Sequence, residues 1–181
     1  IPVSLVYKKG APLESMPMFI TGYGAYEIST DPAFSVARVS MLDRGVLYAV
    51  PHVRGGGEMG RAWYETGRRL NKKHTFEDFV DATAALQDCG LADPARTVAN
   101  GGSAGGLLMG AVANLAPERY AGIEADVPFV DALTTMLDPS LPLTVTEWDA
   151  VARVQAPPAG TVVPGEEGEN PPEVAREDWL I

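Results

Sequence analysis

The sequence predicts an α/β fold in which helices cover both faces of a mostly parallel sheet. Apolar, β-branched stretches of strand length alternate with longer stretches whose apolar residues recur at helical spacing along residues 1–149. One strand-to-helix junction carries NGGSAGG at residues 100–106, a sequence typical of a very tight turn. Regular alternation favours a parallel sheet, because each helix returns the chain to the end where the previous strand began.

Each predicted strand is a short apolar run bounded by glycine, proline or polar turn residues. β-Branched and aromatic side chains favour strands because they pack well on a pleated surface. Pro51 lies near the end of its run, which fits because proline cannot donate to a sheet ladder. The predicted strands are residues 1–7, 17–23, 46–53, 97–101 and 121–129.

Helices are predicted from end signals and apolar periodicity. Residues 31–45 open with Asp-Pro and end before Gly45, which favours a helix. Thr75 and Asp78 resemble a capping box at the start of the next helix. Its apolar face consists of Phe76, Phe79, Val80, Thr83 and Leu86. The apolar face of a further helix, after Ser103, consists of Leu107, Leu108, Ala111, Val112 and Leu115.

Length, charge and cysteine content exclude several classes of protein. The 181 residues suffice for one domain with its own core. A net charge of −10 argues against a nucleic-acid partner and against an anionic membrane surface. The single Cys89 excludes an internal disulfide and a cysteine-based metal site. No apolar run reaches the length of a membrane span, and we expect no cofactor.

The composition changes after residue 149. Residues 150–181 hold five prolines, three glycines and six acidic residues against two arginines. Such a segment cannot bury enough apolar surface to offset the entropy of ordering. We therefore divide the chain into a domain of residues 1–149 and an irregular or disordered tail of residues 150–181.

A first glycine-rich loop has two interpretations. Gly55, Gly57 and Gly60 match the G-x-G-x-x-G spacing of a dinucleotide-binding loop and follow a predicted strand. However, Glu58 would repel a pyrophosphate placed in that loop. The favoured interpretation is a turn in which glycines let the backbone pass close to a neighbouring segment.

The second glycine-rich loop predicts a nucleophile. Gly101, Ser103 and Gly105 have the G-x-S-x-G spacing, between a predicted strand and a predicted helix. The serine of such an elbow has a strained backbone, so its neighbours must be very small. The N–H of Ala104 is the expected first donor to an oxyanion, and the loop at residues 22–26 offers Tyr23 or Tyr26 for the second.

Several separate motifs, in this order, resemble the prolyl oligopeptidase family of serine peptidases. A further segment is similar to the oligopeptidase B branch of that family. The family motifs are TGYGAYEIS (21–29), PHVRGGGEMGRAWYETG (51–67), FEDFVDA (76–82) and NGGSAGGLLMG (100–110). The branch segment is VPFVDALTTMLDPSLPLTVTEWD (127–149).

The resemblance implies that residues 1–149 are a partial catalytic domain with an α/β-hydrolase fold, incomplete here at both ends, and that the family joins this domain to a β-propeller. It implies that Ser103 is the nucleophile and that Tyr23 and Ala104 form the oxyanion hole. Tyr26 matches a residue that lines the substrate pocket.

The branch resemblance implies a substrate class. Glu147 matches an acid that binds Arg or Lys before the scissile bond, and Asp149 lies where the branch carries a second acid. Paired carboxylates hold a guanidinium by charge-assisted hydrogen bonds. The expected partners are therefore short peptides with Arg or Lys, and the expected location is the cytoplasm.

The expected catalytic triad is incomplete. In this fold the acid and the histidine follow the serine along the chain, but His52 and His74 both precede Ser103. We expect both to be structural, and we expect the triad Asp and His, like the propeller, to be absent from this chain. A shifted reading frame or a truncation would explain the tail. The alternatives are an esterase or acyl-peptide hydrolase with the same elbow, and a non-catalytic remnant.

Overall fold

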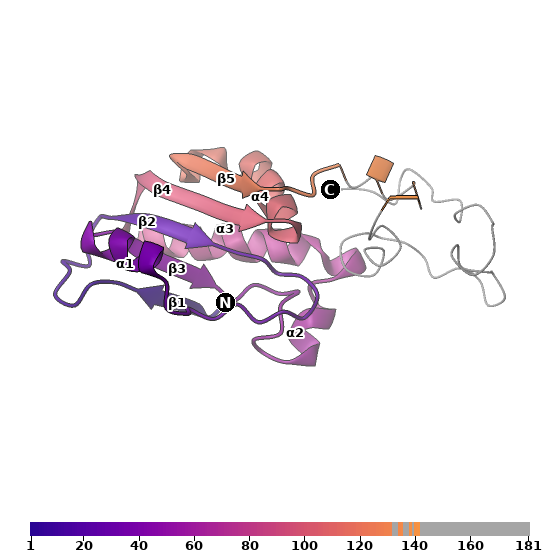
Figure 1. The fold of residues 1–181 in the computed structure, drawn as a ribbon, viewed down its shortest axis with the longest axis horizontal. Coiled ribbons are helices and arrows are strands. Elements are labelled where there is room, and N and C mark those ends of the chain that lie inside the picture. Colours follow the sequence, from indigo (N-terminus) through magenta and orange to yellow (C-terminus); the bar gives the residue numbers. More distant parts are fainter. Residues whose placement is uncertain (132–133, 136–137, 139, 142–181) are drawn as a thin grey trace.

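The computed structural model describes residues 1–131, 134–135, 138 and 140–141. Within these residues, five strands form one sheet in the order β1-β3-β2-β4-β5 (Figure 1). β1 pairs antiparallel with β3, whereas all other pairs are parallel. The strands are β1 (Val3–Val6), β2 (Met16–Thr21), β3 (Leu47–Pro51), β4 (Ala92–Gly102) and β5 (Gly122–Asp126). The predicted mostly parallel sheet is confirmed.

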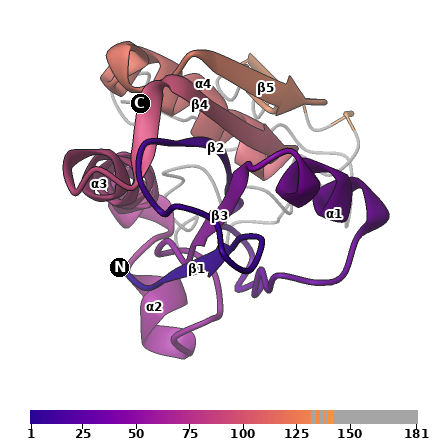
Figure 2. The ribbon, with the colours of Figure 1, turned by 90° about the vertical axis from the view of Figure 1, so that its left-hand side faces the viewer.

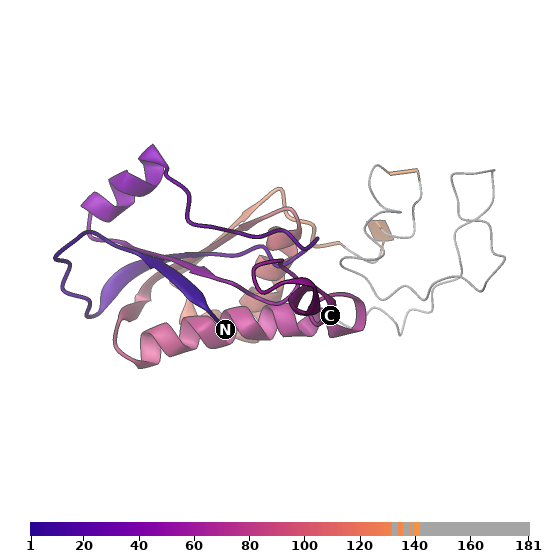
Figure 3. The ribbon, with the colours of Figure 1, turned by 90° about the horizontal axis from the view of Figure 1, so that it is seen from below.

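Helices connect the parallel strands and cover both faces of the sheet. Figure 3 shows α1 on one side of the sheet and the long α3 on the other. The α-helices are α1 (Val36–Asp43), α2 (Arg61–Glu65), α3 (Lys73–Asp88) and α4 (Ala104–Leu115). The short 3₁₀ helices are η1 (Arg69–Asn71) and η2 (Pro117–Arg119). No helix in the described residues is long and apolar enough to cross a membrane.

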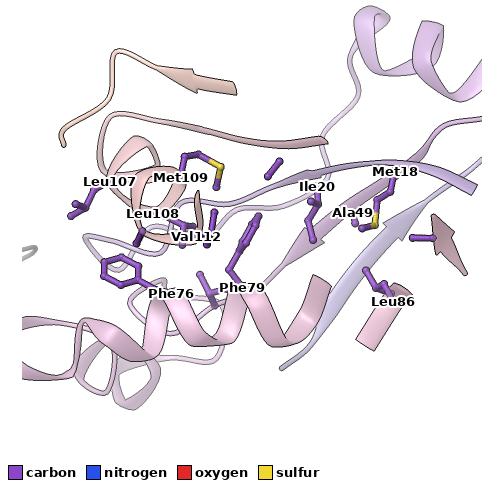
Figure 4. Close-up of a cluster of buried hydrophobic side chains, with 14 of the residues drawn as sticks. Met18, Ile20, Ala49, Phe76, Phe79, Leu86, Leu107, Leu108, Met109 and Val112 are labelled. Atoms are coloured by element: carbon purple, nitrogen blue, oxygen red, sulfur yellow. The ribbon is translucent and has the colours of Figure 1, made fainter. Parts of the chain in front are cut away.

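The main core lies between the sheet and the pair α3 and α4 (Figure 4). Phe79 and Leu108 are fully buried there, facing Ile20 of β2 and Ala99 of β4. The register pairs Ile20 with Ala99, so alternate residues of both strands face these helices. The predicted helix faces are therefore largely confirmed, except that Leu115 is 58% exposed at the end of α4.

α1 packs on the opposite face and starts later than predicted. Its N-cap is Ser35, whose Oγ accepts from the Arg38 N–H, so the helix does not begin at the Asp-Pro pair. Arg38 lies 4.1 Å above the centre of the Tyr48 ring, and Tyr48 stacks on Phe19. The view along the sheet in Figure 2 shows α1 and α3 on different sides of β3.

The capping box predicted at Thr75 and Asp78 is wrong. α3 begins at Lys73, and its N-cap residue, Lys72, makes no side-chain cap. The Thr75 hydroxyl donates instead to the Arg54 carbonyl at 2.6 Å. Asp78 accepts from the Arg54 N–H at 2.9 Å and from its guanidinium at 2.6 and 2.8 Å. A side chain that holds another segment cannot also cap its own helix.

Candidate active site

Ser103 occupies a strained turn between β4 and α4. Its φ of 55° and ψ of −115° fall in a region that residues with a side chain rarely adopt. The Ser103 N–H donates to the Asp126 carbonyl at 2.9 Å, and the Ser103 carbonyl accepts from the Gly106 N–H at 2.9 Å. It also accepts from the Phe129 N–H at 3.1 Å. Neighbouring segments therefore hold the strained conformation in place.

The two glycines of the motif are required by close backbone contacts. A Cβ on Gly101 would lie 2.7 Å from the Gly105 carbonyl carbon and closer still to its oxygen. A Cβ on Gly105 would lie 2.6 Å from the Gly22 carbonyl oxygen. Since real Cβ atoms do not approach backbone this closely, any larger residue would displace the turn. The strand, tight turn and helix predicted around Ser103 are all present.

Ala104 follows Ser103 directly, and Tyr23 packs against Gly105, two residues after Ser103. An added Cβ on Gly105 would be 3.5 Å from Tyr23 Cα, which places Tyr23 against the first turn of α4. The N–H of Gly22 donates to the Asn100 carbonyl at 3.1 Å, which fixes β2 to β4 just before the turn. Ala104 is the first residue of α4, where backbone N–H groups have no intrahelical partner. The structure thus brings together three of the predicted site residues.

Tyr26 lies next to Tyr23, with its ring centre 6.1 Å away. Its φ of 59° is unusual for a residue with a side chain. The predicted acids Glu147 and Asp149 lie outside the described residues, as does the predicted tail at 150–181. The described residues therefore include Ser103, Ala104, Tyr23 and Tyr26 but neither predicted acid.

Both histidines are bonded elsewhere. His52 Nε2 lies 2.8 Å from Ser4 Oγ, and His52 Nδ1 lies 3.6 Å from Glu58 Oε1. His74 Nδ1 donates to the Thr66 carbonyl at 2.9 Å. The predicted structural roles of the two imidazoles agree with these contacts.

Acids that follow Ser103 are also held by their own neighbours. Asp126 accepts from Asn100 Nδ2 at 3.3 Å. Hydrogen bonds from the Thr134 hydroxyl and N–H lower the pKa of Asp131. In the described part of the chain, no group of three or more His, Cys, Asp or Glu is placed to hold a metal ion.

The glycine-rich loop after β3 packs against another loop. A Cβ on Gly55 would collide with the Gly24 carbonyl, and one on Gly57 with the Glu27 carbonyl. The Glu58 carboxylate lies within the same contact and accepts from the Thr30 N–H at 2.8 Å. This is the close backbone approach that the sequence favoured over a dinucleotide loop.

Lys72 is a buried residue that sequence reasoning missed. It is 6% exposed, and its Nζ donates to the Gly24 carbonyl at 2.6 Å. Nothing in the polar run RRLNKKH distinguishes it from the exposed Lys73. Its burial follows from the tertiary contact between α3 and the loop after β2.

Comparison with known proteins places this geometry in a family. A sequence model described as "Prolyl oligopeptidase family" matches residues 32–160. "Dipeptidyl aminopeptidase BI" of Pseudoxanthomonas mexicana is 57% identical over 150 residues, which are 82% of this chain and 21% of that protein. "Protease 2" of Moraxella lacunata is 48% identical over 151 residues, 82% of this chain and 22% of that protein. The chain therefore spans about a fifth of the length of these curated relatives.

A solved structure agrees with the sequence comparison. Oligopeptidase B from Trypanosoma brucei, with covalently bound antipain, superposes with a TM-score of 0.79 and 49% identity. The match covers 82% of this chain and 21% of that one. Neighbours of this kind are α/β-hydrolase catalytic domains, so the predicted fold class is confirmed.

Proposed function

The chain belongs to the prolyl oligopeptidase family of serine peptidases, and from that premise we propose that it carries the nucleophile and oxyanion part of a peptidase site. Ser103 Oγ attacks the carbonyl carbon of a scissile peptide bond. The Ala104 N–H and the Tyr23 hydroxyl donate to the oxygen, which becomes negative as the tetrahedral intermediate forms. The N-terminal end of α4 points at the same centre and favours negative charge there.

The backbone of Ser103 carries this proposal. A strained φ of 55° is costly for a residue with a side chain. The turn is also closely packed, because a Cβ on Gly101 or Gly105 would collide with neighbouring backbone atoms. Tyr23 comes from a different segment than Ala104, yet it packs against Gly105 in the first turn of α4. A general base is still needed, because a serine hydroxyl is a weak nucleophile until its proton is accepted. We assign that role to a residue other than His52 and His74.

Covalent labelling tests the proposal. We expect a fluorophosphonate to label the purified chain at Ser103, slowly if no base is present and faster when the remainder of a family catalytic domain is added. Ser103→Ala should abolish labelling, and Ser4→Ala is the control, since Ser4 bonds to His52 rather than to the turn. Labelling that persists in Ser103→Ala would contradict the assignment. If the wild-type chain is not labelled either, the result would favour the non-catalytic remnant.

Cleavage after Arg or Lys is the finer part of the proposal. It is supported by the match of Glu147 and Asp149 to the oligopeptidase B pattern and by the oligopeptidase B neighbour. When the chain is combined with the remainder of a family catalytic domain and is active, Glu147→Gln should reduce kcat/KM for an arginyl amide far more than for a leucyl amide. An equal reduction for both substrates would remove the specificity assignment. A plain acyl ester cleaved faster than an arginyl substrate would favour the esterase alternative.

A second candidate is removal of dipeptides from free N-termini. It is favoured by the 57% identity to a protein named dipeptidyl aminopeptidase BI. Matched substrates with a free and a blocked N-terminus separate the two, because an endopeptidase accepts both and a dipeptidyl aminopeptidase only the free one. A cytoplasmic location also belongs to the proposal and rests on the family resemblance alone.

A further inference from the structure

The loop that carries Tyr23 has an unfavourable backbone and must be held by its surroundings. This tyrosine loop, residues 22–30, contains Tyr26 and Glu27 with φ of 59° and 58°, besides Gly24 at 69°. Each non-glycine residue in that region costs on the order of 1 kcal/mol and persists only where other contacts impose it. The contacts that hold the loop therefore also decide where the Tyr23 side chain points.

One buried polar contact to this loop comes from Lys72. Its ammonium donates to the Gly24 carbonyl at 2.6 Å, next to Tyr23 in the chain. The Gly24 peptide is enclosed on its other sides, because a Cβ there would meet Val53 and Thr75 side chains. A charge-assisted bond to a carbonyl in a closed space has little freedom to rotate. The ammonium of Lys72 thus restricts the orientation of the peptide between Gly24 and Ala25, one residue beyond Tyr23.

Stability alone does not account for a lysine at this place. Burial of an ammonium is costly. Lys72 also stands at the N-terminus of α3, where the helix dipole opposes a cation. Buried ionic groups can often be replaced by apolar residues of similar volume without loss of stability. What the lysine supplies and an apolar side chain of its size would not is a donor to the Gly24 carbonyl.

We propose that Lys72 is a positioning residue that keeps the Tyr23 hydroxyl directed at the reacting centre by fixing the Gly24 carbonyl. The inference rests on the proposed function of Tyr23 as an oxyanion donor. Lys72 itself does not touch the substrate. Its effect passes through the tyrosine loop, so it should disappear when Tyr23 has no hydroxyl to direct.

A double-mutant cycle measures this dependence. The variants are Lys72→Met, Tyr23→Phe and the double variant, with Lys73→Met as a matched control on the exposed neighbouring residue. The readout is the rate of Ser103 labelling by a fluorophosphonate, resolved into the maximal rate kinact and the half-saturating concentration KI. We expect Lys72→Met to lower kinact by about 10-fold with KI unchanged, less than the ~100-fold or more typical of losing one oxyanion donor outright.

The double variant decides between positioning and a general structural effect. If Lys72 acts through Tyr23, the double variant labels as slowly as Tyr23→Phe alone, within about twofold. Losses that multiply, or a similar loss in Lys73→Met, would overturn the inference. Thermal unfolding of all variants should agree closely, and a large drop for Lys72→Met would assign the residue to stability instead.

Failure of the proposed function is recognised separately. An unlabelled wild-type chain would overturn the role of Ser103. Amide hydrogen exchange would still test whether Lys72 holds the tyrosine loop. In Lys72→Met the amides of residues 22–30 should exchange faster than in wild type, whereas Lys73→Met leaves them unchanged. Unchanged exchange in Lys72→Met would show that Lys72 does not hold the tyrosine loop.

Discussion

Replacing Gly101 by alanine tests whether the turn at Ser103 depends on close backbone packing. The added Cβ would lie 2.7 Å from the Gly105 carbonyl carbon, whereas ordinary contact begins at 3.4 Å, so the two segments must separate by about 0.7 Å. The Gly105 carbonyl oxygen would be closer still, so about 0.7 Å is the smallest separation that relieves the contact. Neither partner is a flexible side chain, and Gly105 itself lies against the Gly22 carbonyl. The displacement therefore reaches Ser103, two residues from Gly101.

The magnitude follows from this displacement. A misplacement of about 1 Å at a reacting group costs roughly 100-fold in rate. For a displacement of at least about 0.7 Å we expect the labelling of Ser103 to slow by at least about 10-fold. Overpacking should also cost about 1–3 kcal/mol of stability, which for a chain of this size lowers Tm by about 2–12 °C.

Gly102→Ala is the matched control, because it adds the same methyl group one residue away. A Cβ on Gly102 meets nothing closer than 3.4 Å, at the Asp126 carbonyl oxygen. We expect its labelling rate and its Tm to stay close to wild type. If Gly101→Ala and Gly102→Ala changed the labelling rate and Tm by the same amounts, the steric reasoning would be refuted. The Tm comparison tests the packing even if labelling of the wild-type chain is slow.

Three further outcomes are expected from the packing and the charges. Asp78→Asn should lower the free energy of unfolding in urea by about 3 kcal/mol, because it leaves the Arg54 guanidinium unneutralised, and adding Arg54→Met should restore part of the loss. Phe79→Ala removes a fully buried ring and should cost about 3–5 kcal/mol, measured in the same way. Burial raises the pKa of Tyr120 above 10.0, so its neutral form stabilises the fold below that pH and this contribution is lost as the pH rises through the higher, folded-state pKa. Tyr120→Phe should therefore flatten the decline of Tm above pH 10, and an unchanged decline would contradict the assignment.

The sequence was sufficient to predict the fold class and the turn at Ser103, because both depend on local patterns. Strand runs and helical faces reflect which side of an element is buried, and Phe79 and Leu108 are buried as their spacing predicts. The elbow is predicted because its sterics are local: Gly101 and Gly105 are in contact within five residues of each other. Substrate-binding roles for Glu147 and Asp149 remain predictions.

Long-range contacts decided what the sequence did not reveal. Asp78 has the right spacing from Thr75 for a cap. Its carboxylate instead binds the guanidinium of Arg54, 24 residues earlier in the chain. Lys72 lies 48 residues from the carbonyl it holds. A local pattern carries no information about such a partner, since a buried lysine and an exposed one look alike in a polar run.

The glycine-rich loop after β3 shows how one motif supports another. Its spacing suggested a ligand, but Gly55 and Gly57 lie against the Gly24 and Glu27 carbonyls, and the Glu27 N–H donates to the Gly55 carbonyl at 3.2 Å. Only residues without a side chain allow two backbones to pack this closely. Each segment then imposes on the other a conformation that neither would keep alone. The glycines that resemble a phosphate loop are thus part of the support for the tyrosine loop, which places Tyr23 beside Ser103.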